Sequence, residues 1–116
     1  MPQYKSENAA GMDLSTTTHT ILEPQTTTIL RTGIEVTIPP NYVGILKTRS
    51  SLAKSEISIE GEVIDSDYTG EILLLVRNHN PTIPFEVRKK DQLAQMLILP
   101  ILNPRIKEVA NSRQTK

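Results

Sequence analysis

Two apolar segments of the chain are joined at residues 61–71 by the sequence Gly61-Glu62-Val63-Ile64-Asp65-Ser66-Asp67-Tyr68-Thr69-Gly70-Glu71. The segment before it contains Ile57 and Ile59, and the segment after it is Ile72-Leu73-Leu74-Leu75-Val76. Apolar, largely β-branched residues on both sides of an Asp, Ser, Thr and Gly cluster predict two β-strands and a polar loop. The sequence therefore predicts a β-hairpin whose tip carries two carboxylates and a tyrosine.

This loop has three interpretations, of which the simplest is a solvated turn. The second is a calcium loop, because Asp65, Asp67 and Gly70 occupy positions 1, 3 and 6 of an EF-hand pattern. We reject it because Val76 stands at position 12, where that pattern needs a bidentate Glu, and because the flanks resemble strands. The third is a catalytic loop, in which either carboxylate could act as a general base, since side chains two residues apart share a face.

The size and composition of the chain limit its function. Its 116 residues are expected to form a single domain, residues 1–116, with an aliphatic core, because there is no Trp and one Phe. A formal net charge of zero argues against binding nucleic acid through bulk electrostatics. The absence of cysteine excludes a thiolate nucleophile and a zinc–thiolate site. With no signal-peptide core and no run of membrane-spanning length, we expect an intracellular, soluble protein, cytoplasmic or nuclear, without membrane partners.

Short apolar segments alternate with turn residues along the rest of the chain, at a spacing typical of all-β domains. They predict strands over residues 26–30, 34–38, 42–47, 85–87 and 93–99. The segment Arg49-Ser50-Ser51-Leu52-Ala53-Lys54 differs, because it combines helix-forming residues with serines that favour an N-cap. A short helix there could bind a phosphate group, because its free N–H groups and the paired N–H donors of the Arg49 guanidinium match phosphate oxygens. An ordinary capped turn with a solvated arginine is the alternative.

Two further segments carry acids beside predicted strands. Ala10-Gly11-Met12-Asp13-Leu14 places small residues before one carboxylate, which suggests a close backbone approach at the end of a strand. In Lys90-Asp91-Gln92-Leu93-Ala94-Gln95, Asp91 is also explained as a turn residue and Gln95 as an amide on the polar face of a strand. The two histidines lie in polar loops and receive no role, and no histidine and acid have the spacing of metal ligands.

Taken together and in this order, the four segments resemble the first four sequence motifs of the trimeric deoxyuridine triphosphatases (dUTPases). The motifs are Ala10–Leu14, Arg49–Ala53, Gly61–Glu71 and Asp91–Gln95. The resemblance covers residues 10–99, and the third motif is the most specific. The compact length is similar to that of viral or mobile-element members of the family, for which a virion is a further location.

The resemblance implies a fold, a reaction and a cofactor. The fold is all-β, a jelly-roll-like dUTPase barrel with one short helix, assembled as a homotrimer with active sites at the subunit interfaces. The reaction hydrolyses dUTP to dUMP and pyrophosphate by in-line attack of water at the α-phosphate, which limits uracil incorporation into DNA and supplies dUMP. The cofactor is Mg²⁺, which the substrate phosphates and waters hold without a direct protein ligand, with support from Asp13.

The resemblance also implies roles for residues of the third motif. Asp65 matches the acid that orients and deprotonates the attacking water, a choice that the residues alone left open between Asp65 and Asp67. Tyr68 matches the ring that packs against the deoxyribose and leaves no room for a 2′-hydroxyl. The backbone of the hairpin matches the part that binds uracil. The residues assigned to this pocket are Ile59, Gly61, Val63 and Ile64.

The other motifs imply the contacts with phosphate. The residues assigned to these contacts are Arg49, Ser50, Ser51 and Gln95. The carboxylates expected to support them without touching the substrate are Asp13, Asp67 and Asp91. Phosphoryl transfer depends on positioning and on neutralising phosphate charge, which a guanidinium, backbone N–H groups and Mg²⁺ supply.

The chain departs from the family pattern at three places. Glu62 and Lys90 stand where the family usually has glycine, and Glu62 could require a backbone angle that glycine adopts more easily. The Gly-rich fifth motif is absent from residues 1–116, and we expect it to follow Lys116. Glu62 and the missing fifth motif favour one alternative, a dUTPase-like module that binds a nucleotide or protein with weak turnover. Two further alternatives are a dCTP deaminase of the same fold, whose Arg-Ser-Ser segment is similar but whose third region differs, and a structural β-domain without a ligand.

Overall fold

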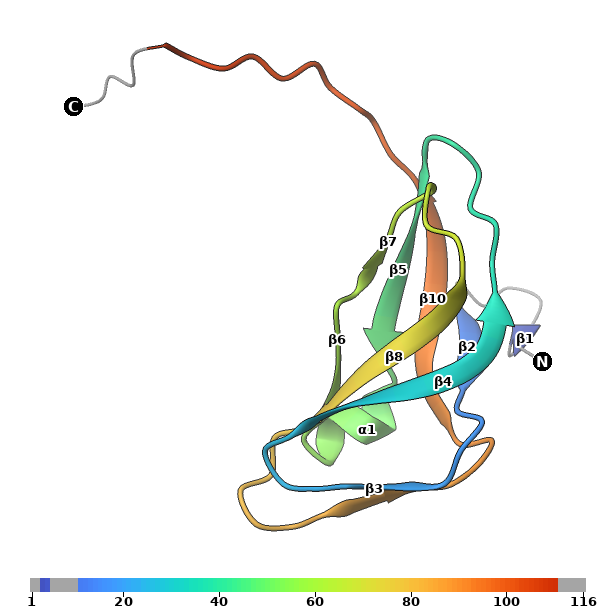
Figure 1. The fold of residues 1–116 in the computed structure, drawn as a ribbon, viewed down its shortest axis with the longest axis vertical. Coiled ribbons are helices and arrows are strands. Elements are labelled where there is room, and N and C mark those ends of the chain that lie inside the picture. The colour runs from blue at the N-terminus through green and yellow to red at the C-terminus, as the bar shows by residue number, and fades with distance from the viewer. Residues whose placement is uncertain (1–2, 5–10, 111–116) are drawn as a thin grey trace.

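The computed structural model describes residues 3–4 and 11–110, which form two main β-sheets and one short helix (Figure 1). The larger sheet has the order β1-β2-β10-β5-β7. Its strands are β1 (Gln3–Tyr4), β2 (Met12–Ser15), β10 (Gln92–Pro100), β5 (Tyr42–Thr48) and β7 (Val63–Ile64). The smaller sheet has the order β4-β8-β6, with β4 (Thr27–Glu35), β8 (Glu71–Asn78) and β6 (Ile57–Glu60). A third sheet pairs β3 (Thr20–Leu22) with β9 (Phe85–Val87), so the all-β prediction is confirmed.

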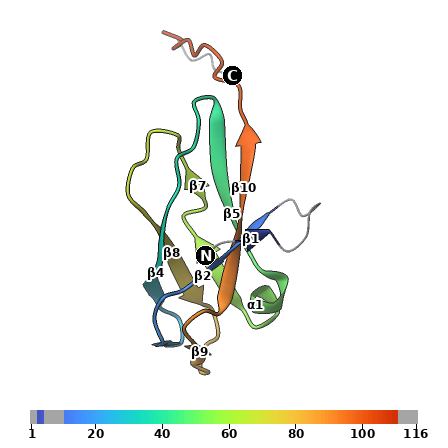
Figure 2. The same cartoon turned by 90° about the vertical axis from the view of Figure 1, so that its right-hand side faces the viewer.

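The inner faces of the two main sheets bury an aliphatic core. Figure 2 shows the layer of β4 and β8 beside the layer of β5 and β10. Along β8, Ile72 and Leu74 are buried, whereas Leu73 between them is 39% exposed. Leu46 of β5 and Met96 of β10 are buried from the other layer. Alternate residues of each strand therefore face inward, as the period of two predicts.

The predicted short helix is present as α1 (Ser50–Lys54), but the predicted serine N-cap is wrong. The N-cap is Arg49, whose carbonyl accepts hydrogen bonds from the N–H groups of Leu52 and Ala53 at 3.0 and 3.1 Å. No side chain caps the helix, because both serines lie inside its first turn. Their hydroxyl groups are therefore left exposed at the surface.

The predicted hairpin in residues 61–71 is only partly correct. β6 and β8 pair antiparallel, as expected for its two arms. β7 leaves this pair and joins β5, with Val63 opposite Ile45 and Ile64 opposite Gly44. The chain changes sheet at Gly61, whose φ of +61° lies in the left-handed region that glycine adopts readily. The loop between β7 and β8 therefore connects the two main sheets.

β4 combines segments that the sequence predicts as two separate strands, 26–30 and 34–38. The strand ends at Glu35, so residues 36–38 lie beyond it. The register of β4 with β8 shifts between Arg31 and Glu35, and Gly33, with a φ of +70°, lies inside this irregular part. A bulge of this kind bends a strand without ending it, which explains why the two predicted strands are one.

The chain beyond β10 is extended. Residues 101–110 form no strand or helix and are all exposed. Ala10 of the first motif and tail residues 111–116 lie outside the described residues. In the described ranges, 3–4 and 11–110, no helix has the length and apolar character needed to span a membrane.

Candidate active site

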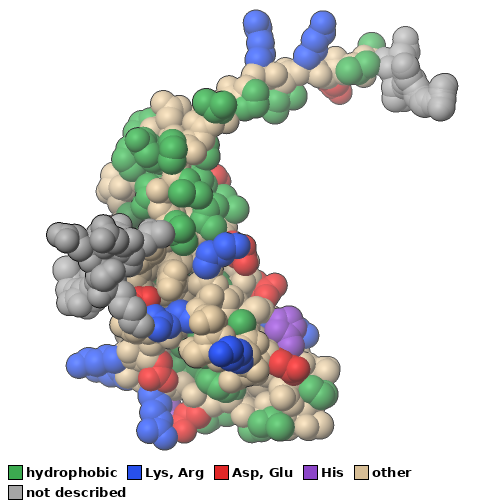
Figure 3. All heavy atoms as spheres, turned by 180° about the vertical axis from the view of Figure 1, so that it is seen from behind, with side chains coloured by type: hydrophobic (Ala, Val, Ile, Leu, Met, Phe, Trp, Pro, Cys, Tyr) green, Lys and Arg blue, Asp and Glu red, His purple; other side chains and the backbone are tan. Residues whose placement is uncertain are grey.

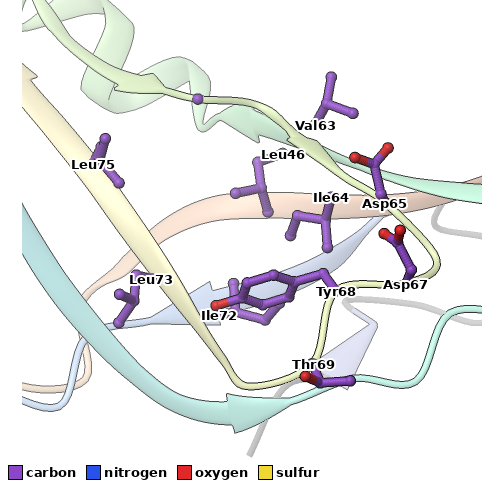
Figure 4. A pocket seen from close by; sticks show the side chains of 11 residues that line it. Leu46, Val63, Ile64, Asp65, Asp67, Tyr68, Thr69, Ile72, Leu73 and Leu75 are labelled. Carbon is purple, nitrogen blue, oxygen red and sulfur yellow. The ribbon is translucent and has the colours of Figure 1, made fainter.

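A pocket of about 620 Å³ lies between β7, the loop that follows it, and β8 (Figure 4). It is lined by Leu46, Gly61, Val63, Ile64, Asp65, Asp67, Tyr68, Thr69, Ile72, Leu73 and Leu75. Apolar side chains form its walls, and a few polar groups border it, which is the usual composition of a small-molecule site. The structure thus brings together most of the residues that the third motif assigns to substrate.

Hydrogen bonds hold the loop that carries the two carboxylates. The N–H of Tyr68 donates to the carbonyl of Asp65 at 3.1 Å, which closes a tight turn. The Tyr68 hydroxyl donates to the carbonyl oxygen of Glu71 at 2.6 Å. Gly70 has a φ of +125°, and a Cβ at that position would lie 3.5 Å from Tyr68 Oη. Glycine therefore lets the backbone pass beside the ring and enter β8.

Asp65 and Asp67 are both exposed and both border the pocket. Figure 4 shows their carboxylates close together at one end of the pocket, with the Tyr68 ring extending along it towards Leu73. A carboxylate in this position can accept a proton from a water molecule held in the pocket. The arrangement places a candidate base, an aromatic ring and apolar walls around one volume.

Two features of this region differ from the sequence-based expectation. Ile59 is 2% exposed and packs in the core, with its N–H bonded to Thr48 Oγ1 at 2.9 Å, so its side chain does not border the pocket. Glu62 is not among the residues with positive φ, so the backbone conflict expected at this position does not arise. Its Oε1 lies 4.0 Å from Lys47 Nζ. Gly61, one residue earlier, adopts the left-handed conformation instead.

A second group of predicted residues surrounds Arg49. Its Nη1 donates to Asp13 Oδ1 at 2.7 Å and to Gln92 Oε1 at 3.2 Å. The side chains of Arg49 and Asp13 are 19% and 6% exposed, so this ion pair is largely shielded from water. The sequence did not single out Gln92, although its place beside Asp91 in the fourth motif was a usable signal. A shallow pocket here is lined by Arg49, Ser51, Leu52, Phe85, Asp91, Gln92 and Leu93.

Gln95 lies on the same face of the larger sheet as Asp13, because the two residues are directly opposite each other on β10 and β2. A Cβ at Gly11 would lie 3.0 Å from Gln95 Oε1, so the glycine leaves room for this amide. Ser50 and Ser51 are exposed on the first turn of α1, directly after Arg49. The residues assigned to phosphate therefore gather at one end of this face.

The residues around Asp91 form a turn. Its Oδ2 accepts the N–H of Arg88 at 2.8 Å, and its own N–H donates to the carbonyl of Arg88 at 3.0 Å. This is the turn role that the sequence left as an alternative for Asp91. Lys90 has a φ of +76°, so the lysine keeps the left-handed conformation suited to the glycine that it replaces, with some strain.

The two groups of residues lie towards opposite ends of the molecule. In Figure 1 the loop between β7 and β8 is at the upper end and α1 is at the lower end. Ile64 pairs with Gly44 near the start of β5, whereas Arg49 follows the last residue of that strand. At a rise of about 3.4 Å per residue, the stretch from Gly44 to Arg49 spans roughly 17 Å. One chain alone therefore does not bring Asp65 and Arg49 to the same phosphate.

The donor groups of the chain fit a Mg²⁺ ion that is bound mainly through a phosphate ligand. Among the described residues, no three His, Asp or Glu side chains lie close enough together to hold an ion. Asp13, the predicted support, already accepts a hydrogen bond from Arg49. Mg²⁺ prefers oxygen ligands and commonly uses one or two carboxylates together with substrate phosphates. The phosphates of a bound nucleotide would therefore supply most of the oxygen ligands of such an ion.

Comparison with known proteins identifies relatives of the whole chain. The family model described as dUTPase matches residues 1–116. A deoxyuridine 5′-triphosphate nucleotidohydrolase of Caldanaerobacter subterraneus subsp. tengcongensis is 36% identical over 122 residues, which cover 100% of this chain and 81% of that protein. A protein of the same name from Clostridium tetani is 38% identical and covers 94% of this chain and 77% of its own length. A Gag-Pro-Pol polyprotein of Simian retrovirus SRV-1 is 38% identical over 81% of this chain and 5% of the polyprotein.

Two solved structures with the same fold come from phages. The dUTPase of phage phi11 of S. aureus, described with a structural Mg(II) ion, has a TM-score of 0.86 at 26% identity, over 96% of this chain and 90% of that one. The dUTPase of Staphylococcus bacteriophage 80alpha has a TM-score of 0.87 at 26% identity, over 98% and 91%. These matches confirm the predicted jelly roll, and viral relatives agree with a mobile-element origin. The chain belongs to the dUTPase family, the deoxyuridine 5′-triphosphate nucleotidohydrolases.

Proposed function

We propose that this chain hydrolyses dUTP to dUMP and pyrophosphate by attack of water at the α-phosphate. The observation that supports this most directly is the Asp65–Tyr68 turn, which sets a carboxylate and an aromatic ring at the edge of an apolar pocket. A flat base suits apolar walls, and backbone groups of β7, whose residues Val63 and Ile64 line the pocket, would bind its edge. The names of the relatives support dUTP as the substrate. A structure of the 80alpha dUTPase with dUpNHpp supports the binding of a nucleotide by a protein of this fold.

Each group has one task in the proposed reaction. Asp65 accepts the proton of the attacking water, and the Tyr68 ring stands against the sugar. Arg49 and the first turn of α1 receive the phosphates, because a guanidinium fork and free backbone N–H groups match phosphate oxygens. Bound Mg²⁺ would neutralise charge on the phosphates as the bond to the leaving pyrophosphate breaks. Asp13 holds the guanidinium of Arg49 in place.

A homotrimer would join the two separated groups of residues across a subunit interface. The outer face of the larger sheet carries an apolar row in which Val63, Ile45 and Leu97 lie directly opposite one another. Val63 is 62% exposed, and Leu99 on the same face of β10 is 43% exposed. Figure 3 shows apolar side chains gathered over the upper part of this side of the molecule. A neighbour covering this patch would lie beside Gln95, the next residue along the same face.

A panel of nucleotides tests the reaction. With Mg²⁺, we expect pyrophosphate release from dUTP and a kcat/KM at least about a hundredfold lower for UTP and dTTP, because a site built for one sugar and one base rejects added groups. Ammonia release from dCTP would instead support the deaminase. Tight binding of dUTP without turnover would support the alternative of a nucleotide-binding module. If no nucleotide binds, the remaining alternative is a structural β-domain without a ligand.

Mixing two inactive variants tests whether the site spans subunits. Asp65→Asn removes the base, and Arg49→Lys removes the planar fork while it keeps a charge beside Asp13. Suppose that each site takes Asp65 from one chain and Arg49 from the next. In trimers mixed from equal amounts of the two variants, about a quarter of the sites then receive both wild-type residues. We expect co-expression to restore about that fraction of activity. A site contained within one chain would regain none, and light scattering would report the mass of the assembly.

A further inference from the structure

The carboxylate of Glu71, at the start of β8, is bound by two residues of β4. Arg31 Nε donates to Oε1 and Oε2 at 3.0 and 3.1 Å, and Arg31 Nη2 lies 2.9 Å from Oε1. The N–H of Gly33 donates to Oε2 at 2.7 Å. The bonds from Arg31, and then that from Gly33, hold the pKa of Glu71 below its ordinary value. We call Arg31, Gly33 and Glu71 the Glu71 clamp.

The clamp lies at the bulge of β4 and fixes the start of β8. The regular pairing of β4 with β8 is interrupted there, so the Gly33 N–H uses a side-chain acceptor in place of a ladder carbonyl. The adjacent Thr32 Oγ1 donates to the carbonyl of Ile72 at 2.6 Å. Two consecutive residues of β8, Glu71 and Ile72, are therefore tied to the bulge.

The orientation of the Tyr68 ring depends on the backbone of Glu71. Its hydroxyl donates to the carbonyl oxygen of Glu71, so the residue that the clamp fixes also fixes the far end of the ring. Its N–H donates to the carbonyl of Asp65, which fixes the near end. Tyr68 is 43% exposed, so burial contributes little to its orientation. Figure 4 shows the ring along the side of the pocket rather than packed within the core.

We propose that the Glu71 clamp positions Tyr68 and thereby sets the preference of the site for a deoxyribonucleotide over a ribonucleotide. This inference rests on the proposed function, because it requires the sugar to lie against Tyr68. A ring held at both ends leaves no room for a 2′-hydroxyl, whereas a ring that can move aside admits one. Arg31 and Glu71 do not line the pocket, so they act through Tyr68 as positioning residues.

Three variants separate this role from a general effect on folding. Glu71→Gln keeps the size of the side chain but removes the charge that holds the Arg31 fork. Arg31→Lys keeps the charge and removes the fork, so it should act in the same direction but less strongly. Glu86→Gln is the matched control, because Glu86 is also paired with an arginine, Arg88, but lies on β9, which pairs with β3 away from the loop.

Steady-state pyrophosphate release from dUTP and UTP is the first measurement. We expect Glu71→Gln to lower the ratio of kcat/KM for dUTP over UTP about tenfold, through a higher KM for dUTP and a lower KM for UTP, with little change in kcat for dUTP. Arg31→Lys should fall between wild type and Glu71→Gln, and Glu86→Gln should match wild type. An unchanged ratio, or an equal loss of kcat with both nucleotides, would overturn the proposal.

Hydrogen exchange is the second measurement, and it does not depend on activity. The Tyr68 amide, which donates to Asp65, should exchange about tenfold faster in Glu71→Gln than in wild type or Glu86→Gln. Unchanged exchange would show that the clamp does not hold the loop and would overturn the proposal. If wild type does not hydrolyse dUTP but exchange responds as expected, the proposed function fails and the positioning of Tyr68 stands.

Discussion

Arg49 Nη1 lies 2.7 Å from Asp13 Oδ1, and this ion pair joins β2 to the residue that follows β5. Both side chains are largely shielded from water, so the guanidinium is oriented before any ligand arrives. Gln92 receives a further hydrogen bond from the same Nη1. Three segments that are far apart in the sequence thus set the direction of one cation.

Removing one partner of this ion pair should lower the stability of the fold. Asp13→Ala leaves the Arg49 charge shielded and unpaired, and we expect it to lower the free energy of unfolding by about 3 kcal/mol in urea titrations. Asp67→Ala is the control, because Asp67 is exposed and its loss should change stability by less than about 0.5 kcal/mol. A loss below about 1 kcal/mol for Asp13→Ala would show that the pair is solvated in solution.

The two carboxylates of the loop should differ in function despite their proximity. Asp65→Asn should lower kcat for dUTP by at least about a thousandfold with little change in dUTP affinity, because an amide cannot accept the proton of the attacking water. Asp67→Asn should retain most of the activity. Single-turnover rates and equilibrium binding of both variants provide the measurement. The reverse pattern would assign the base to Asp67.

The turn at Lys90 should contain removable strain. Its φ of +76° is unfavourable for a residue with a Cβ, so Lys90→Gly should raise the free energy of unfolding by about 0.5 kcal/mol. Lys89 is not among the residues with positive φ, and Lys89→Gly should lower stability by a similar amount, because glycine adds freedom to the unfolded chain. Thermal unfolding of the two variants would disagree with this account if both shifted in the same direction.

The Glu71 clamp should respond to acid. The pKa of Glu71 is lowered from an ordinary 4.5, first by the Arg31 hydrogen bonds and then by the Gly33 N–H. A lowered folded pKa means that the ionised group stabilises the fold above the unfolded value and loses this effect as pH falls through the folded value. The stability difference between wild type and Glu71→Gln should therefore be constant near neutral pH and shrink below about pH 4.5. A difference that grew in acid would contradict the clamp.

Features that depend on neighbours in the chain were predictable from the sequence. The apolar segments 42–47 and 93–99, bounded by turn residues, predicted β5 and β10, and the helix-forming residues after Arg49 predicted α1. The order of the four motifs predicted the family. The N-cap of α1 was missed by one residue, because a serine favours that position without requiring it.

Features that depend on distant partners were not predictable. Val63 and Ile64 pair with β5 rather than β8, because the turn at Gly61 redirects them to the other sheet. Ile59 was assigned to the pocket, yet its face of β6 points into the core. The contact of Arg31 with Glu71 joins residues 40 positions apart and has no local signature.

The sequence by itself determined the four motifs, the position of α1 and most of the longer strands, since these follow from side-chain type and short-range periodicity. The tertiary structure alone decided that Asp65 and Arg49 lie near opposite ends of one chain, and that Tyr68 is held through the backbone of Glu71. The physical reason is that strand pairing between distant segments sets these distances, and pairing partners are selected by the packing of the whole molecule.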